Sequence, residues 1–290
     1  MENTLQKVKT EVFTVAGKNG IPMAADATYI KSEKAMPVIV YAHGINGFKD
    51  WGGMDLIAQE FARQGFIFVK FNFSHNGTTP AHPMEFYDLN AYENDNYLTR
   101  QQDLSCLISF IEEEYHDWPV DHDALHLLGH SRGGIDALLF ASDERIASLV
   151  TWSAPATAQT PWSKWDSEKM DLWKNEGVVY LENKRTHQKL PIGFQLYEEF
   201  KSHKNNLLNT EKAAREMQKP WLIAHGEDDE AVFVKEAYQL KEWQPQAQVA
   251  LIENTGHTFD RRHPWEASKL PEASQKVVAE TIRFLNKIKS

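Results

Sequence analysis

The sequence predicts an α/β fold, with a mostly parallel central sheet, helices on both faces of that sheet, and an inserted cap. Short continuous apolar runs, of the length that suits strands buried on both faces, alternate with segments of helical spacing. This alternation stops over residues 155–219 and then resumes. We therefore expect a core formed by residues 1–154 and 220–290, and a cap or lid formed by residues 155–219.

The composition is that of an ordinary globular protein. Of its 290 residues, 42% are hydrophobic and 25% are charged. The net charge is −10 and lysines and arginines form no stripe, which argues against a nucleic-acid partner. The single cysteine, Cys106, cannot form an internal disulfide. No apolar run is long enough to span a membrane and the N-terminal stretch lacks the core of a signal peptide, so we expect a cytoplasmic protein. The sequence predicts no particular oligomeric state.

The first half of the chain reads as a hairpin followed by alternating strands and helices. A turn that contains Asn19-Gly20 separates two extended segments, which is typical of an antiparallel hairpin. Residues 81–96 are mixed in character, and we expect a long surface loop there. The predicted strands are 12–15, 23–30, 37–42, 66–73, 125–128 and 146–152, and the predicted helices lie near 54–65, 104–114 and 135–141.

The second half contains the predicted cap. Residues 155–219 are too many for a simple connection and too rich in structure-forming residues to be disordered. Within them, residues 178–181 and 192–196 look like a pair of strands. Trp162, Trp165 and Trp173 would form either the interior of the cap or a wall of a substrate pocket. After the cap we expect strands at 220–224 and 248–252 and helices at 234–243 and 274–287.

A glycine-bracketed serine stands at the centre of the predicted sheet. The segment Gly129-His130-Ser131-Arg132-Gly133 follows a buried strand and precedes a run of good helix formers. A strand that turns into a helix within a few residues strains the serine between them, and small neighbours avoid the clash. Such a turn exposes the serine hydroxyl at the edge of the sheet, where the helix N-terminus favours negative charge. The pattern therefore predicts a nucleophilic serine at Ser131.

Two later strand ends carry candidate partners for that serine. Asp228 and Asp229 follow the strand at 220–224, and His257 follows the strand at 248–252. The carboxyl ends of parallel strands meet at one crevice, so we expect these side chains to lie near Ser131. A histidine would accept the serine proton, and an aspartate would orient the histidine and stabilise its charged form. The order along the chain is serine, aspartate, histidine.

These motifs resemble those of the α/β-hydrolase-fold serine hydrolases over residues 12–288. Within that family the chain is more similar to the dienelactone hydrolase, feruloyl esterase and serine aminopeptidase-like branches than to the lipases with an HGGG loop. The matching motifs are His43-Gly44, the serine turn at 129–133, the H-G-x-x-D motif at 225–229, and Gly256-His257.

The resemblance implies a role for each of these positions. The H-G-x-x-D spacing lands on Asp229, so Asp229 rather than Asp228 would be the acid. The backbone N–H groups of Ile45 and Arg132 would form the oxyanion hole, and the family needs no cofactor. His43 would brace the oxyanion loop by hydrogen bonding.

Other polar residues are open to more than one interpretation. The Arg132 side chain would bind an anionic substrate group or, more commonly, form a salt bridge to Asp136. His75 and Trp162 are candidate substrate contacts, although residues 75–77 also fit a simple turn. No metal site is expected, because His126 and the histidine near it lack a third convergent ligand.

The sequence thus predicts a cofactor-independent serine hydrolase that cleaves a small-molecule carboxylic ester through an acyl-enzyme. A thioesterase or a serine aminopeptidase-like peptidase is the enzymatic alternative, because the same triad opens thioesters and amides. A ligand-binding or interaction protein that retains the fold is the non-enzymatic alternative. The sequence specifies neither the acyl group nor the leaving group.

Overall fold

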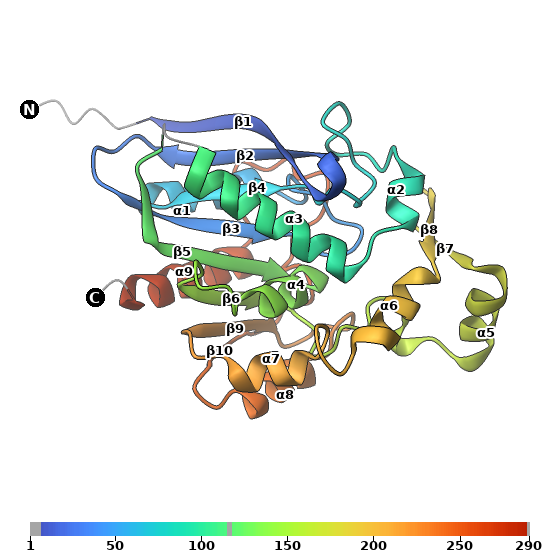
Figure 1. Cartoon of the computed structure of the whole chain (residues 1–290). Helices are drawn as coiled ribbons and strands as arrows, with labels where there is room; N and C mark the ends of the chain where they lie inside the picture. Colours follow the sequence, from blue (N-terminus) through green and yellow to red (C-terminus); the bar gives the residue numbers. More distant parts are fainter. Residues whose placement is uncertain (1–6, 115–117, 289–290) are drawn as a thin grey trace, which may run out of the picture.

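The computed structural model describes residues 7–114 and 118–288 and is built around one large sheet (Figure 1). In the described residues this sheet has eight strands in the order β1-β2-β4-β3-β5-β6-β9-β10. β1 and β2 pair antiparallel, as do β2 and β4, and all other neighbours are parallel, which confirms the predicted hairpin and the mostly parallel sheet. The strands are β1 (Val8–Ala16), β2 (Pro22–Ile30), β3 (Met36–Ala42), β4 (Ile67–Phe71), β5 (Val120–His130), β6 (Ser148–Trp152), β9 (Trp221–Gly226) and β10 (Gln248–Ile252).

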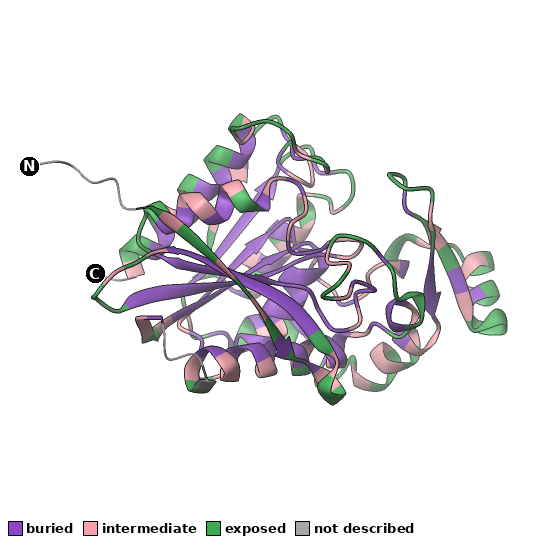
Figure 2. Cartoon of the chain, turned by 90° about the horizontal axis from the view of Figure 1, so that it is seen from above, coloured by how far each residue is buried: buried purple, intermediate pink, exposed green. Residues whose placement is uncertain are grey.

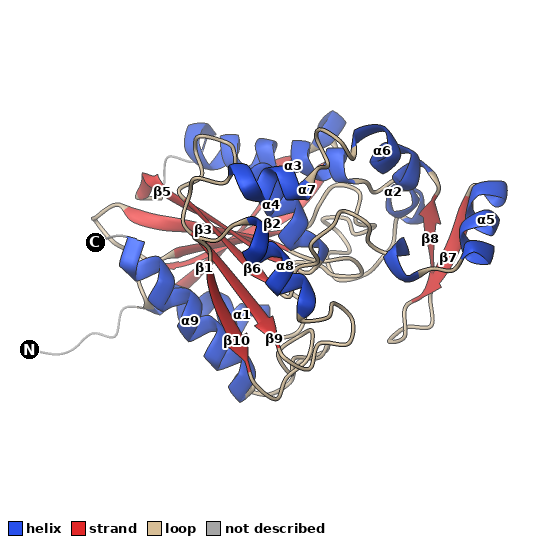
Figure 3. Ribbon diagram, turned by 90° about the horizontal axis from the view of Figure 1, so that it is seen from below, coloured by secondary structure: helices blue, strands red, loops and turns tan. Residues whose placement is uncertain are grey.

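Helices cover both faces of this sheet, as predicted (Figure 3). One face carries α1 (Met54–Arg63) and α9 (Glu272–Ile288), whose apolar residues join one core cluster. The other face carries α3 (Tyr97–Ser109), α4 (Arg132–Phe140), α7 (Thr210–Glu216) and α8 (Lys235–Trp243). None of the described helices combines the length and the apolar character needed to cross a membrane.

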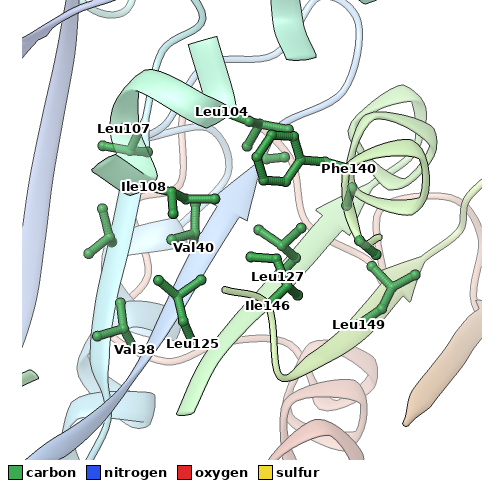
Figure 4. Close-up of a cluster of buried hydrophobic side chains, with 14 of the residues drawn as sticks. Val38, Val40, Leu104, Leu107, Ile108, Leu125, Leu127, Phe140, Ile146 and Leu149 are labelled. Atoms are coloured by element: carbon green, nitrogen blue, oxygen red, sulfur yellow. The ribbon is translucent and has the colours of Figure 1, made fainter. Parts of the chain in front are cut away.

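The inner strands are buried on both faces, which explains their continuous apolar sequences (Figure 2). Successive side chains of a strand point to opposite faces. In β3, Val38 and Val40 therefore join the cluster under α3 and α4, whereas Ile39 and Tyr41 join the cluster under α1 and α9. Figure 4 shows the first cluster, where Leu104 and other side chains of α3 face β3 and β5.

The prediction of a surface loop over residues 81–96 is wrong in part. This segment contains the short helix α2 (Leu89–Glu93), in which Ala91 and Tyr92 are buried. The Asp88 side chain caps α2 by accepting a hydrogen bond from the Ala91 N–H at 2.9 Å. The following helix, α3, begins at Tyr97 rather than near residue 104, because Asn96 caps it in the same way. Because this segment is mixed and polar in sequence, the starts of these two helices could not be predicted.

Residues 155–219 contain a second, two-stranded sheet that lies outside the central one (Figure 1). β7 (Val178–Glu182) and β8 (Lys189–Gly193) pair antiparallel, and α5 (Ser167–Glu176) and α6 (Gln195–His203) flank them. The second strand therefore lies a few residues before its predicted position. β3 and β5 point toward this part of the molecule, so it lies at the carboxyl ends of the parallel strands. α7 also falls within 155–219, but it packs against α4 and α8.

The tryptophans of this segment pack against one another. The ring centroids of Trp162 and Trp165 lie 5.7 Å and 5.1 Å from that of Trp173. Trp173 is fully buried, and its indole N–H donates a hydrogen bond to the Ile192 carbonyl oxygen at 2.7 Å. These contacts join α5 to the β7-β8 sheet. Of the two roles considered for the tryptophans, interior packing is the one that the structure supports.

We expect replacement of Trp173 with alanine to lower the free energy of unfolding of the segment by about 3–5 kcal/mol, because it removes a large buried side chain and leaves the Ile192 carbonyl unpaired. The neighbouring variant Leu172→Ala is the control, since Leu172 is 52% exposed and its loss should change stability by less than about 0.5 kcal/mol. Urea unfolding followed by tryptophan fluorescence measures both. Equal stability of the two variants would contradict the interior role.

Candidate active site

Ser131 lies in a tight turn between β5 and α4. Its backbone is strained, with φ 55° and ψ −127°, and its N–H donates to the Trp152 carbonyl oxygen at 2.9 Å. The turn leaves no room for side chains beside it. A Cβ on Gly129 would lie 2.2 Å from the Gly133 carbonyl oxygen, and a Cβ on Gly133 would lie 2.2 Å from that of Ala42. The glycines are thus required by packing, and the turn presents Ser131 at the end of the sheet.

Asp229 and His257 are joined by a hydrogen bond. His257 Nδ1 lies 2.8 Å from Asp229 Oδ2, while Asp229 Oδ1 accepts the backbone N–H groups of Ala231 and Val232 at 2.9 and 2.8 Å. When Nδ1 donates to the carboxylate, Nε2 of His257 remains free to accept a proton. Asp228 is exposed, and Asp229 is the aspartate that is hydrogen-bonded to His257.

The environment of Asp229 keeps its carboxyl group ionised. Burial acts to raise the pKa of Asp229, but the hydrogen bonds from His225 and His257 outweigh it, and the pKa lies well below its usual range. His225 Nε2 lies 3.4 Å from Asp229 Oδ2 and 2.8 Å from the Val232 carbonyl oxygen. His225 therefore steadies the turn that carries the aspartate, a role that the sequence analysis missed.

Ser131 and His257 line one cavity of about 710 Å³. Gly44 and Ile45, which follow β3, also line it, and a Cβ on Gly44 would lie 2.9 Å from the Ser131 Cβ. Strand register explains this approach, because Ala42 at the end of β3 pairs with Gly129 at the end of β5. The loop after β3 is thereby held against the serine turn.

His43 braces this loop in the way the sequence predicts. Its Nδ1 lies 2.9 Å from the Gly44 carbonyl oxygen, and its Nε2 lies 3.2 Å from the Asn76 side-chain amide nitrogen. Burial, reinforced by the charge of Arg100, lowers the pKa of His43 to about 3, so the ring is neutral. Within the described residues, neither the Ile45 N–H nor the Arg132 N–H donates to another protein group. Both amides adjoin the Ser131 turn and have the chemistry of oxyanion donors.

The expected contacts of the Arg132 side chain are wrong. Arg132 is 1% exposed, and its Nη1 pairs with Asp95 Oδ2 at 2.9 Å instead of with Asp136. Asp136 pairs with Arg100, which also contacts Asp95. The Arg132 guanidinium lies over the Tyr97 ring at 4.6 Å. The first turn of α4 is buried against α3 and the segment before it, so the side chain points away from the cavity.

The structure places the two candidate substrate contacts, His75 and Trp162, outside the lining of this cavity. Among the described residues that line the cavity, neither His75 nor Trp162 is present. His75 Nδ1 lies 2.7 Å from the Ser74 Oγ, and Trp162 is 5% exposed within the tryptophan cluster. The candidate metal histidine, His126, is buried with its Nδ1 2.9 Å from the Ser148 Oγ.

His130 is a site residue that the sequence analysis missed. Its Nε2 lies 2.9 Å from the carbonyl oxygen of His257, and the two ring centroids are 4.9 Å apart. Burial first, and then the charges of His257 and Arg261, lower the pKa of His130 well below its usual value. The neutral ring thus donates to the loop that carries His257. Its position directly before Ser131 is the feature of the sequence that could have identified it.

Comparisons with known proteins identify the family and the fold of the chain. The model of a family described as "Putative esterase" matches residues 26–276. No curated protein matches the chain in sequence.

Among solved structures, DcsB in complex with its substrate analogue is similar with a TM-score of 0.72 at 17% identity, covering 96% of this chain and 99% of that one. Est1E from Butyrivibrio proteoclasticus with ferulic acid bound gives 0.71 at 17% identity, over 94% and 98% of the two chains. The acylaminoacyl peptidase of Pyrococcus horikoshii gives 0.66 at 16% identity, over 97% of this chain and 42% of that one. At these identities the structural likeness establishes the fold.

The low pKa of His43 predicts a loss of stability in acid. A histidine in the unfolded chain binds a proton below about pH 6.5, whereas folded His43 does so only near pH 3, so the free energy of unfolding falls as the pH drops through this range. In His43→Gln the slope of that free energy against pH should be shallower by about 1.4 kcal/mol per pH unit. Urea unfolding at a series of pH values measures it, and equal slopes in the two proteins would refute the prediction.

Proposed function

The chain belongs to the esterase family and is a hydrolase that acts on esters, and from this premise we propose that Ser131, His257 and Asp229 form its catalytic triad. Membership of this family sets aside the non-enzymatic alternative. The observation that carries the proposal is the 2.8 Å contact between His257 Nδ1 and Asp229 Oδ2, beside a strained serine in the same cavity. A histidine held in this way keeps its second nitrogen available to the serine.

The proposed reaction passes through an acyl-enzyme. The Ser131 Oγ attacks the ester carbonyl carbon while His257 Nε2 takes the serine proton, and Asp229 stabilises the resulting imidazolium. The oxyanion accepts hydrogen bonds from the N–H groups of Ile45 and Arg132. His257 then donates its proton to the departing alkoxide, so the alcohol leaves. A water molecule, deprotonated by His257, cleaves the acyl-enzyme by the same steps and releases the carboxylic acid.

We further propose that residues 155–209 act as the cap over this site. Pro155, Thr160 and Ser163 from the start of the segment line the cavity together with the turn between β7 and β8. α7 is left out of the cap, because it packs on α4 and α8 of the core. A cap of this kind would determine which acyl or alcohol groups fit, and it would limit the access of water to the acyl-enzyme.

Replacement of Ser131 with alanine tests the nucleophile. We expect Ser131→Ala to lose labelling by a fluorophosphonate probe and to lower turnover of a p-nitrophenyl ester by several orders of magnitude, about 10⁶-fold if it behaves as the serine of a protease does. The melting temperature should stay near that of the wild type, because only the hydroxyl is removed. Retained labelling in a folded variant would remove Ser131 from the mechanism.

Two adjacent aspartates test the acid. In Asp229→Asn the amide nearly preserves the shape but favours the wrong histidine tautomer, so kcat should fall by about 10⁴. Asp228→Asn is the matched control, and because Asp228 is exposed its kcat should stay within about twofold of the wild type. Steady-state kinetics on one ester measures both variants. A large loss in Asp228→Asn with normal turnover in Asp229→Asn would reverse the assignment.

A further inference from the structure

The cavity beside Ser131 is basic, although the whole chain carries a net charge of −10. Among the described residues that line it, the carboxylate is Glu236, whose Oε2 already accepts the Ala156 N–H at 2.9 Å. The lysines and arginines that line it are Lys164, Lys184, Arg185, Arg261 and Arg262. The local charge is therefore opposite in sign to that of the protein as a whole.

Arg261 is the buried member of this group. It is 4% exposed, and its Nη1 and Nη2 have no hydrogen-bond partner among the described residues. Burial lowers the pKa of Arg261, and the group that opposes this effect is the Tyr41 hydroxyl rather than a carboxylate. A buried cation without an anionic partner is costly, and it becomes favourable when an anion completes the pair.

The loop that carries His257 also fixes Arg261. Arg261 Nε donates to the Thr258 carbonyl oxygen at 3.2 Å, and the Thr258 hydroxyl donates to the Arg261 carbonyl oxygen at 2.7 Å. Arg261 thus follows His257 by one short turn and stands in the wall of the same cavity, near Trp51, whose ring centroid is 5.8 Å from the guanidinium carbon. Its place in the wall is set by the same turn that sets the catalytic histidine.

The other cations are at the mouth of the cavity. Lys184 and Arg185 are exposed residues in the turn between β7 and β8. Arg185 and His263, two residues beyond Arg261, line the same cavity, so the tip of the hairpin faces the loop that carries Arg261. Burial first, and then the charge of Arg185, lower the pKa of His263. Exposed charges at a mouth steer a charged ligand inward, whereas a buried charge in the wall can hold it.

We propose that the ester cleaved at Ser131 carries a second, anionic group, a carboxylate in the simplest case, which the cavity binds at Arg261. Lys184, Arg185 and Arg262 steer this group into the cavity. The guanidinium suits a carboxylate, because its planar set of donors matches the two carboxylate oxygens. This inference rests on the proposed esterase function and adds the substrate class.

Matched pairs of esters test the inference. One pair places the charge in the acyl group, p-nitrophenyl butyrate against mono-p-nitrophenyl glutarate. A second pair places it in the alcohol, 4-methylphenyl acetate against 4-carboxyphenyl acetate. The measured quantity is the ratio of kcat/KM for the anionic ester to that for the neutral ester. We expect a ratio of at least about 10 in one pair, and which pair it is identifies the side of the substrate that Arg261 contacts.

Variants distinguish the effect of Arg261 in the wall of the cavity from the effect of the exposed cations at its mouth. Arg261→Met should lower the ratio by about tenfold or more, and Arg261→Lys, which keeps the charge, should lower it less. Arg185→Gln should lower the ratio several-fold at low salt, with no difference from the wild type near 1 M salt, where exposed charges are screened. The matched control is Arg215→Gln on the exposed surface of α7, which makes the same change of charge away from the cavity and should leave the ratio unchanged.

The outcomes distinguish this inference from the proposed function. Ratios near 1 in both pairs for the wild type, with the neutral esters hydrolysed, would overturn the anionic substrate and leave the esterase mechanism intact. Failure to hydrolyse any ester, together with absent probe labelling, would overturn the mechanism itself. If Arg261→Met does not fold, two other measurements decide: the ratio for the double variant Lys184→Gln/Arg185→Gln, and the ratio for the wild type at low and at high salt. A ratio that stays the same in both measurements would refute the inference.

Discussion

The close packing of the Ser131 turn against the end of β3 is the constraint on which the rest of the site depends. The Gly133 Cα faces the carbonyl oxygen of Ala42 so closely that no side chain fits between them. The same contact holds Gly44 and Ile45 beside the serine, and the pairing of Ala42 with Gly129 keeps the two strand ends level. Hydrolytic chemistry requires a nucleophile and its oxyanion donors at a fixed separation. Here backbone packing sets the separation between Ser131 and the segment Gly44-Ile45.

Much of the fold could be predicted because a strand that is buried on both faces has a continuous apolar sequence. The runs at 37–42 and 220–224 have few polar residues, and helices such as α1 and α9 carry strong apolar periodicity. Residues 81–96 could not be predicted in this way. Their structure depends on caps made by Asp88 and Asn96 and on partners distant in sequence, and a polar residue looks the same in a loop as in a cap.

The candidate site, like the fold, could be predicted from the sequence only in part. Ser131, Asp229 and His257 could be placed together because each follows a strand of the same sheet, and topology brings strand ends to one edge. The direction in which each side chain points could not be predicted from the sequence. Arg132 points inward to Asp95. The positions of His130 and Arg261 depend on the path of the 256–263 loop, which has no periodic signal. The position of residues 155–209 determines which other side chains line the cavity.

The buried ion pairs behind the serine turn have a consequence for how this enzyme could be redesigned. Asp95 pairs with Arg100 and Arg132, so the segment before α3 is tied to the first turn of α4. Insertions or grafted loops at 81–96 would separate charges that water cannot reach, and they would disturb the serine turn with them. The turn between β7 and β8, at residues 184–187, is exposed throughout and borders the cavity. New substrate preferences could therefore be selected there at little cost to folding, and natural variation among relatives should concentrate in the same place.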